Sequence, residues 1–251
     1  MSQRRVHRES TTRGHIEVWD EDRRRSLWFD DVILQTEIHL DDPAVLPNAV
    51  NQAMLAHLMF APAPGRVLLA GCGGGGIARW FNARSPQTAG EAVEYSPEVA
   101  RIARDWFGFP GSETHWTLVT ADIRDHLARP RTAYDFILVD IEEGQWTPEW
   151  TFTPDFLARC HASLSAAGVL TLNTISRDAA MFARILGQVR STFRGGTACL
   201  RIPAFDNVLI IAFRTPPPAP DPETAGRRWG LPFSRYLADM VANAPGTTPV
   251  F

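Results

Sequence analysis

The sequence predicts an α/β fold in which helices cover both faces of a mostly parallel sheet. Between residues 66 and 193, short apolar segments typical of buried strands alternate with amphipathic segments typical of helices. The first of these strands runs directly into a glycine-rich turn that begins at Gly71. Three segments with strand-like patterns precede this region, so a small N-terminal antiparallel sheet is also predicted.

The composition is that of a globular protein, with 45% hydrophobic and 21% charged residues in a chain of 251. The longest apolar run, residues 208–213, is far shorter than the ~20 residues of a membrane-spanning helix. No apolar signal-peptide stretch follows the arginine-rich start, so we expect a cytoplasmic protein with no membrane partner. Three scattered cysteines without a CxxC pair predict neither disulfides nor a zinc site.

The charged residues argue against nucleic-acid binding and against reactions that need a lysine. All 25 basic residues are arginine, and 28 acidic residues bring the net charge to −3. This balance predicts that the protein has no nucleic-acid partner. The absence of lysine excludes Schiff-base and P-loop lysine chemistry.

The N-terminal elements come first along the chain. Residues 15–20, 25–29 and 32–40 alternate apolar with polar residues or carry β-branched and aromatic ones, which predicts three antiparallel strands. Residues 45–60 place apolar side chains at helical spacing. We therefore predict an N-terminal β-sheet region over residues 1–44, followed by a helix.

The alternating region supplies the main sheet of a domain predicted over residues 45–214. The predicted strands are 67–70, 91–94, 117–119, 136–140 and 169–173, and the predicted helices are 77–83, 97–107, 154–166 and 177–193. Residues 198–202 and 208–213 form an antiparallel C-terminal edge in this prediction. Repeated proline makes residues 215–223 a linker, so residues 215–251 are predicted to be a proline-rich linker and tail with one amphipathic stretch at 233–241.

Three features on consecutive strand–helix units predict an adenosine site. Gly71, Gly73 and Gly75 allow the backbone of the first turn to approach a ligand closely. Glu94 ends the second strand, where Rossmann-like folds place an acid that accepts hydrogen bonds from ribose hydroxyls. Asp122 follows the third strand and can accept from the amine of a purine.

The same stretches resemble motifs of the spermidine synthase family of aminopropyltransferases. The family's G-G-G-D-G-G loop is matched by residues 71–76 and its E-[ILV]-D segment by residues 94–96. The G-D pair is matched by residues 121–122, and [FY]-D-x-I-x-x-D by residues 134–140. The small N-terminal sheet also resembles this family, and the chain is most similar to its bacterial spermidine-synthase-like branch.

The resemblance implies a Rossmann-like class I methyltransferase fold and a transferase of polyamine biosynthesis. Its implied co-substrate is decarboxylated S-adenosylmethionine or S-adenosylmethionine, with no metal, and its implied partners are a small-molecule amine and a second copy in a homodimer. Gln35 lies near the family's cofactor-contacting glutamine. Asn51 and Gln52 lie where the family holds its amine substrate.

Two departures leave other functions open. Gly74 stands where the family has an acid that contacts the aminopropyl amine, and Asn51 stands where it has a tyrosine. A G-C-G-x-G loop, here residues 71–75, is also common among methyltransferases. The alternatives are therefore an S-adenosylmethionine-dependent methyltransferase of a small molecule, or a cofactor-binding homologue without catalysis.

Asp140 is the candidate catalytic residue because it ends the fourth strand, where open α/β sheets place their ligands. A carboxylate there can orient a cationic amine and accept its proton as the new bond forms. The resemblance places Glu143 as a second acid of the catalytic loop. Glu142 and Trp146 are predicted to bind the acceptor as part of an acidic and aromatic lid.

Overall fold

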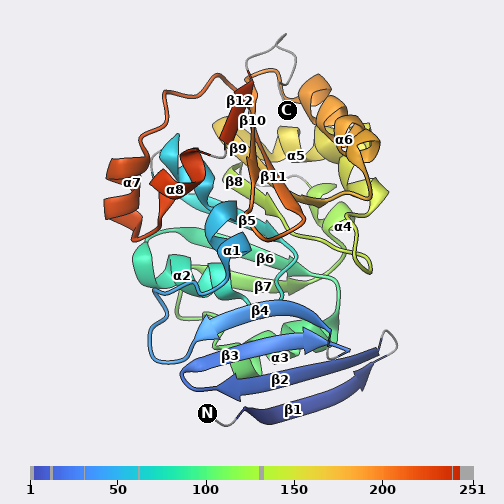
Figure 1. Ribbon diagram of the computed structural model, residues 1–251, viewed down its shortest axis with the longest axis vertical. Coiled ribbons are helices and arrows are strands. Elements are labelled where there is room, and N and C mark those ends of the chain that lie inside the picture. Colours follow the sequence, from blue (N-terminus) through green and yellow to red (C-terminus); the bar gives the residue numbers. More distant parts are fainter. Residues whose placement is uncertain are drawn as a thin grey trace.

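A computed structural model of the chain describes residues 3–11, 14–30, 32–61, 63–129, 133–238 and 240–243. It contains two sheets, a four-stranded antiparallel one and an eight-stranded one with the order β12-β10-β11-β9-β8-β5-β6-β7. Figure 1 shows the smaller sheet at one end of the molecule, with helix α3 (Pro97–Phe107) behind it. The predicted α/β class, with a mostly parallel sheet and a preceding antiparallel one, is confirmed.

The N-terminal sheet contains one strand more than predicted. Its members are β1 (Arg4–Thr11), β2 (Gly14–Glu21), β3 (Arg24–Phe29) and β4 (Ile33–His39), paired in chain order. Strand β1 was missed because it is an edge strand whose pattern is dominated by charge. Its Arg5 donates to buried Glu17 at 2.8 Å, so these charges help to hold β1 against β2.

The core of the large sheet is parallel. It is built from β5 (Arg66–Ala70), β6 (Ala89–Glu94), β7 (Trp116–Thr120), β8 (Tyr134–Val139) and β9 (Leu164–Ile175). The helices between them are α2 (Gly76–Arg84), α3, α4 (Ile123–Leu127), α5 (Pro154–Ser163) and α6 (Ala179–Thr192), with a 3-10 turn η2 at Glu149–Phe152. Helix α4 was not predicted, because its single turn is too short for a periodic signal.

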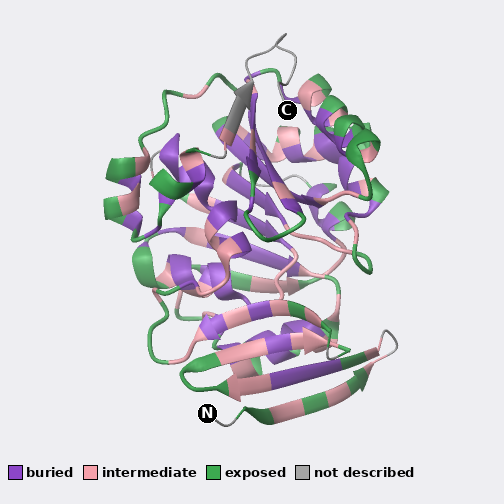
Figure 2. Ribbon diagram, viewed as in Figure 1, coloured by how far each residue is buried: buried purple, intermediate pink, exposed green. Residues whose placement is uncertain are grey.

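The predicted helix over residues 45–60 is divided into α1 (Ala49–Met54) and a 3-10 turn, η1 (Ala56–Met59). The Asn48 side chain caps α1 by accepting from the backbone of Val50 at 2.8 Å. Both pieces are buried against the large sheet, as the purple ribbon of Figure 2 shows. Asn51 and Met54 of α1 line the same hollow as the glycine-rich turn that follows β5.

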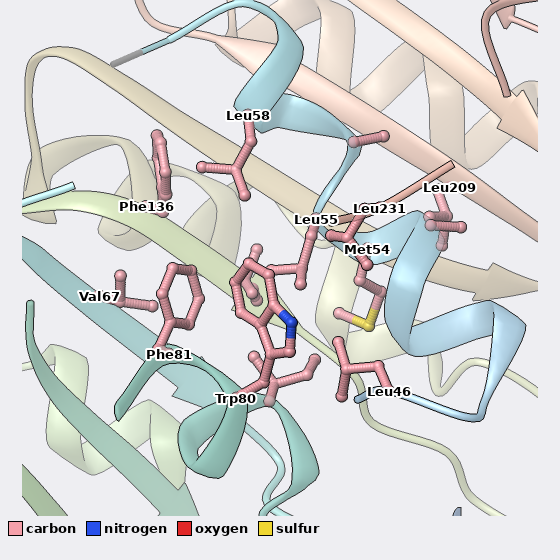
Figure 3. Close-up of a cluster of buried hydrophobic side chains, with 14 of the residues drawn as sticks. Leu46, Met54, Leu55, Leu58, Val67, Trp80, Phe81, Phe136, Leu209 and Leu231 are labelled. Carbon is pink, nitrogen blue, oxygen red and sulfur yellow. The ribbon is translucent and has the colours of Figure 1, made fainter. Parts of the chain in front are cut away.

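Two apolar clusters cover the two faces of the large sheet. One packs α1, η1 and α2 on strand residues such as Leu69 and Leu138, and the other packs α4, α5 and α6 on residues such as Leu68 and Val139. Alternate residues of one strand thus face opposite clusters, as expected for a sheet covered on both sides. Figure 3 shows Trp80 of α2 at the centre of the first cluster.

The C-terminal segment is part of that first cluster. Strands β10 (Thr197–Arg201) and β11 (Asn207–Phe213) are antiparallel, as predicted, and β12 (Met240–Asn243) pairs with β10 at the edge. After the proline-rich connection come α7 (Pro222–Trp229) and α8 (Phe233–Leu237). Their side chains Trp229 and Tyr236 are buried against α1 and α2, so this segment contributes to the core.

Replacing Trp229 with alanine should destabilise the whole protein. The Trp229 ring lies 5.6 Å from that of Trp80, centroid to centroid, and is 3% exposed. Removing such a ring from a packed core costs roughly 3–5 kcal/mol. Urea denaturation followed by circular dichroism measures this loss, with exposed Arg227→Ala as the control. An unchanged midpoint for Trp229→Ala would show that α7 is dispensable for the core.

Candidate active site

The glycine-rich turn after β5 passes directly beneath the end of β8. The Gly71 N–H donates to the Val93 carbonyl at 2.9 Å, and the Asp140 N–H donates to the Ala70 carbonyl at 2.9 Å. Gly71 has φ +89°, and a Cβ built on it would lie 2.1 Å from the Asp140 carbonyl oxygen. Only glycine fits at this position, because both its conformation and its neighbour exclude a side chain.

Glu94 fixes the shape of this turn. Its carboxylate accepts from the Cys72 N–H at 3.0 Å and from the Ser96 N–H at 2.9 Å. Desolvation raises the pKa of the Glu94 carboxyl, and these backbone donors oppose that rise by stabilising the charged form. The acid predicted to bind ribose therefore also connects the ends of β5 and β6.

Strand β4 closes the turn from the other side. The Gly74 N–H donates to the Thr36 hydroxyl at 2.8 Å. A β-bulge sits in β4, because Leu27 pairs with Thr36 while the next residue, Trp28, pairs with Leu34. The bulge leaves Gln35 unpaired, and both Gln35 and Thr36 consequently line the same hollow, although neighbours in a regular strand face opposite sides.

The hollow lies between the glycine-rich turn, β4, α1 and the end of β8, and holds about 460 Å³ including its open mouth. Five predicted site residues line it: Gln35, Asn51, Gly71, Gly73 and Asp140. The other lining residues are Thr36, Met54, Leu69, Cys72, Gly76, Ile77 and Leu138. Polar and apolar side chains thus line one site at the carboxyl ends of the central strands, where open α/β sheets bind their ligands.

Asp140 is held from the side by Asn173, a residue not predicted as functional. The Asn173 Nδ2 donates to Asp140 Oδ1 at 2.8 Å. Desolvation raises the pKa of the Asp140 carboxyl, and the bond from Asn173 opposes this rise. The available signal was a polar amide at the end of a mostly apolar strand segment, residues 169–173.

Asp122 is the N-cap of α4. It accepts from the Arg124 N–H at 2.8 Å and pairs with the Arg124 guanidinium, with Oδ2 to Nη2 at 2.5 Å. This guanidinium lowers the pKa of the Asp122 carboxyl. Asp122 lies outside the lining of the hollow, so its contact with a purine stays a prediction.

The acidic loop after Asp140 is folded into a tight turn. The backbones of Glu143 and Trp146 exchange hydrogen bonds of 3.0 and 3.4 Å, and the Trp150 Nε1 donates to Glu143 Oε1 at 3.3 Å. Burial and the nearby Asp140 charge raise the pKa of Glu142 to about 7. None of Glu142, Glu143 and Trp146 lines the hollow, so their roles stay predictions.

The two predicted substrate-binding residues of α1, Asn51 and Gln52, have different surroundings. Asn51 is 8% exposed and lines the hollow. Gln52 is absent from that lining; its Nε2 donates to the Leu46 carbonyl at 2.5 Å and its Oε1 accepts from the Tyr236 hydroxyl at 3.2 Å. The observed contacts of Gln52 therefore hold α1 against α8, and its binding of substrate stays a prediction.

No protein-family model matches the chain, but individual proteins do. The polyamine aminopropyltransferase of Neisseria meningitidis serogroup A is 29% identical over 238 residues, covering 92% of this chain and 90% of that protein. That of Chromobacterium violaceum is 29% identical over 241 residues, covering 93% and 92%. The human eEF1A lysine and N-terminal methyltransferase is 28% identical over 162 residues, covering 57% of this chain and 23% of that protein.

Solved structures share the fold. A probable spermidine synthase from Corynebacterium glutamicum has a TM-score of 0.76 at 20% identity, with 98% of both chains covered. A spermidine synthase in complex with the transition-state analogue AdoDATO has a TM-score of 0.66 at 20% identity, covering 88% and 76%. Human methyltransferase-like protein 13 in complex with SAH has 0.64 at 22%, covering 76% and 93%. The predicted resemblance to the spermidine synthase family and the class I methyltransferase fold is confirmed.

Replacing Glu94 with glutamine should weaken nucleoside binding by about tenfold or more, because a hydrogen bond to a charged acceptor is worth roughly 1.5–3 kcal/mol. The glutamine also replaces an acceptor of the turn with an NH₂ group. Calorimetry with methylthioadenosine measures the change. Glu98→Gln, in the first turn of α3, is the matched control. Equal affinity in the Glu94 variant would remove Glu94 from the site.

Replacing Gly74 with the aspartate found in the related family should destabilise this chain. A Cβ on Gly74 would lie 2.7 Å from Phe107 Cδ1 and 2.9 Å from Thr36 Cγ2, and Phe107 is fully buried. Overpacking of this kind costs about 1–3 kcal/mol. Urea denaturation measures the loss. Gly187→Ala on α6, with open space around it, should be neutral or stabilising. A Gly74→Asp variant as stable as the wild type would contradict this interpretation.

Proposed function

We propose that this chain is a spermidine-synthase-like transferase that moves an aminopropyl group from decarboxylated S-adenosylmethionine to a small-molecule amine. The observation that carries the proposal is the position of Asp140. It directly follows β8 and lines the hollow, in contact with the glycine-rich turn. Similarity to polyamine aminopropyltransferases over nine-tenths of the chain supports the same reaction.

The residues around the turn fit the adenosine part of the co-substrate. The hollow is bounded by backbone with no side chain at Gly71 and Gly73, so a ligand can lie against it. Glu94 is fixed at the edge of this backbone by bonds from the N–H groups of Cys72 and Ser96, and binding of the ribose by its carboxylate is part of the proposal. Gln35 faces the hollow from β4. The chain is proposed to need no metal, and the described residues contain no metal-binding cluster of three or more His, Cys, Asp or Glu side chains.

Asp140 then performs the acid–base part of the reaction. When bound, the sulfonium co-substrate supplies a carbon that an amine nitrogen can attack, with methylthioadenosine leaving as the carbon–sulfur bond breaks. Asp140 orients the acceptor amine and takes its proton as the carbon–nitrogen bond forms. Asn51, which also lines the hollow, supplies an amide that can donate to or accept from the acceptor. Glu143 is proposed as the second acid, with Glu142 and Trp146 over the acceptor.

Methyl transfer from S-adenosylmethionine is the second candidate. The observation that favours it is Gly74, because a carboxylate at this position would repel the carboxylate of the intact co-substrate and none is present. The similarity to a methyltransferase over 57% of the chain agrees with it. A homologue that binds the nucleoside without catalysis is the third candidate.

The location and the partners of the protein belong to the same proposal. We expect a cytoplasmic homodimer with no nucleic-acid partner, and β1 offers an open sheet edge that a second copy can cover. In the part of the chain that the structure describes, no helix combines the length and apolarity needed to span a bilayer.

Replacing Asp140 with asparagine should reduce turnover by about 10²–10⁴-fold while methylthioadenosine binding survives, because the shape stays and the basicity goes. The assay mixes decarboxylated S-adenosylmethionine with 1,4-diaminobutane and measures spermidine by mass spectrometry. S-adenosylmethionine in parallel tests methyl transfer. Asp135→Asn, at the other end of β8, is the control. Methylated amine as the only product would replace the first candidate by the second, and full turnover in Asp140→Asn would remove Asp140 from the mechanism.

A further inference from the structure

Three polar side chains form a row across the carboxyl edge of the large sheet. Asp140 follows β8, Asn173 lies on β9 and Asn207 begins β11, and these strands are neighbours. The Asn207 Nδ2 donates to Asn173 Oδ1 at 3.0 Å, and the Asn173 Nδ2 donates to Asp140 Oδ1 at 2.8 Å. Asn173 is 3% exposed and Asn207 7%, so the row leads from the core to the hollow.

We propose that Asn173, held in place by Asn207, is a positioning residue for Asp140. It occupies one carboxylate oxygen of Asp140 within the sheet and leaves the other for the amine in the hollow. This inference rests on the proposed function of Asp140 and adds two residues to it.

The donors and acceptors of the row permit only one arrangement. An ionised carboxylate only accepts hydrogen bonds, so the amide of Asn173 must direct its NH₂ group to Asp140. Its carbonyl oxygen then faces Asn207, whose NH₂ group satisfies it. If the Asn173 amide rotated by half a turn, its carbonyl oxygen would face the Asp140 carboxylate and its NH₂ group would face that of Asn207. The bond from Asn207 therefore stabilises the orientation in which Asn173 donates to Asp140.

The hydrogen bond from Asn173 also affects the pKa of Asp140. Desolvation favours the neutral carboxylic acid, which cannot accept a proton, and the Asn173 bond favours the carboxylate. The neighbouring acid that interacts with Asp140 is Glu142, whose pKa is raised by burial and by the Asp140 charge. The Cys72 thiol also lines the hollow, and burial raises its pKa. Loss of the Asn173 bond should therefore shift the titration of Asp140 to higher pH.

The experiment follows the ¹³C shift of the Asp140 carboxyl by NMR titration in the full chain, assigned with Asp140→Asn and repeated in Glu142→Gln to remove the neighbouring titration. The variants are Asn173→Leu, which deletes the donor at similar volume, and Asn173→Asp, which keeps the shape but replaces the donor with a second acid. Thr171→Val is the matched control, because Thr171 is buried on the same strand face and its hydroxyl contacts His57.

The titration midpoint of Asp140 should move to higher pH in Asn173→Leu and further in Asn173→Asp, because like charges disfavour ionisation. Turnover at pH 7 should fall about tenfold in Asn173→Leu, the loss expected from one bond to a charged group, and recover partly at higher pH. Thr171→Val should leave the midpoint and the pH profile unchanged. A purely structural role predicts the reverse order, with Asn173→Asp the milder variant.

Asn207→Ala tests the second link. It should shift the Asp140 midpoint in the same direction by less, and add nothing in the Asn173→Leu background. An unchanged midpoint in both Asn173 variants, with methylthioadenosine binding intact, would overturn the proposal. The proposed function fails separately, if Asp140→Asn keeps full turnover, whatever the titrations show.

Discussion

The whole site depends on the close contact between the turn after β5 and the end of β8. The Gly71 position lies so near the Asp140 carbonyl that no side chain fits between them. This contact brings the glycine-rich backbone proposed to bind the nucleoside and the candidate base Asp140 to the same hollow. It is possible because β5 lies between β6 and β8, so hydrogen bonds from both neighbours reach the turn. Glu94 ties it to β6 and Asp140 ties it to β8.

The N-terminal sheet is the second structural requirement. Arg25 donates to the Trp106 carbonyl at 2.7 Å and Arg79 donates to the His39 carbonyl at 2.8 Å, so the sheet is anchored to α3 and α2. Its last strand then covers the turn, with Thr36 bonded to Gly74. The hollow therefore has one wall from each sheet, and a class I methyltransferase core alone would lack the side formed by β4.

The parts predicted from sequence were those with local signals. Hydrophobic periodicity indicated the parallel strands, and the position of Asp140 after a strand placed it at the correct edge. The partnership of Asp140 with Asn173 depends on which strands are neighbours, which the order of segments does not determine. The bulge that turns Gln35 toward the hollow and the burial of Trp229 likewise depend on tertiary contacts.

The burial of α7 and α8 has a consequence for synthesis of the protein on the ribosome. The apolar cluster around Trp80 gathers residues from Leu46 to Tyr236, so it stays incomplete until nearly all of these have left the exit tunnel. Chains elongate at about 5–20 residues per second, and partly made domains expose apolar surface. The nascent chain therefore carries an open face on α1 and α2 for several seconds, and a chaperone that shields it would act on this protein before release.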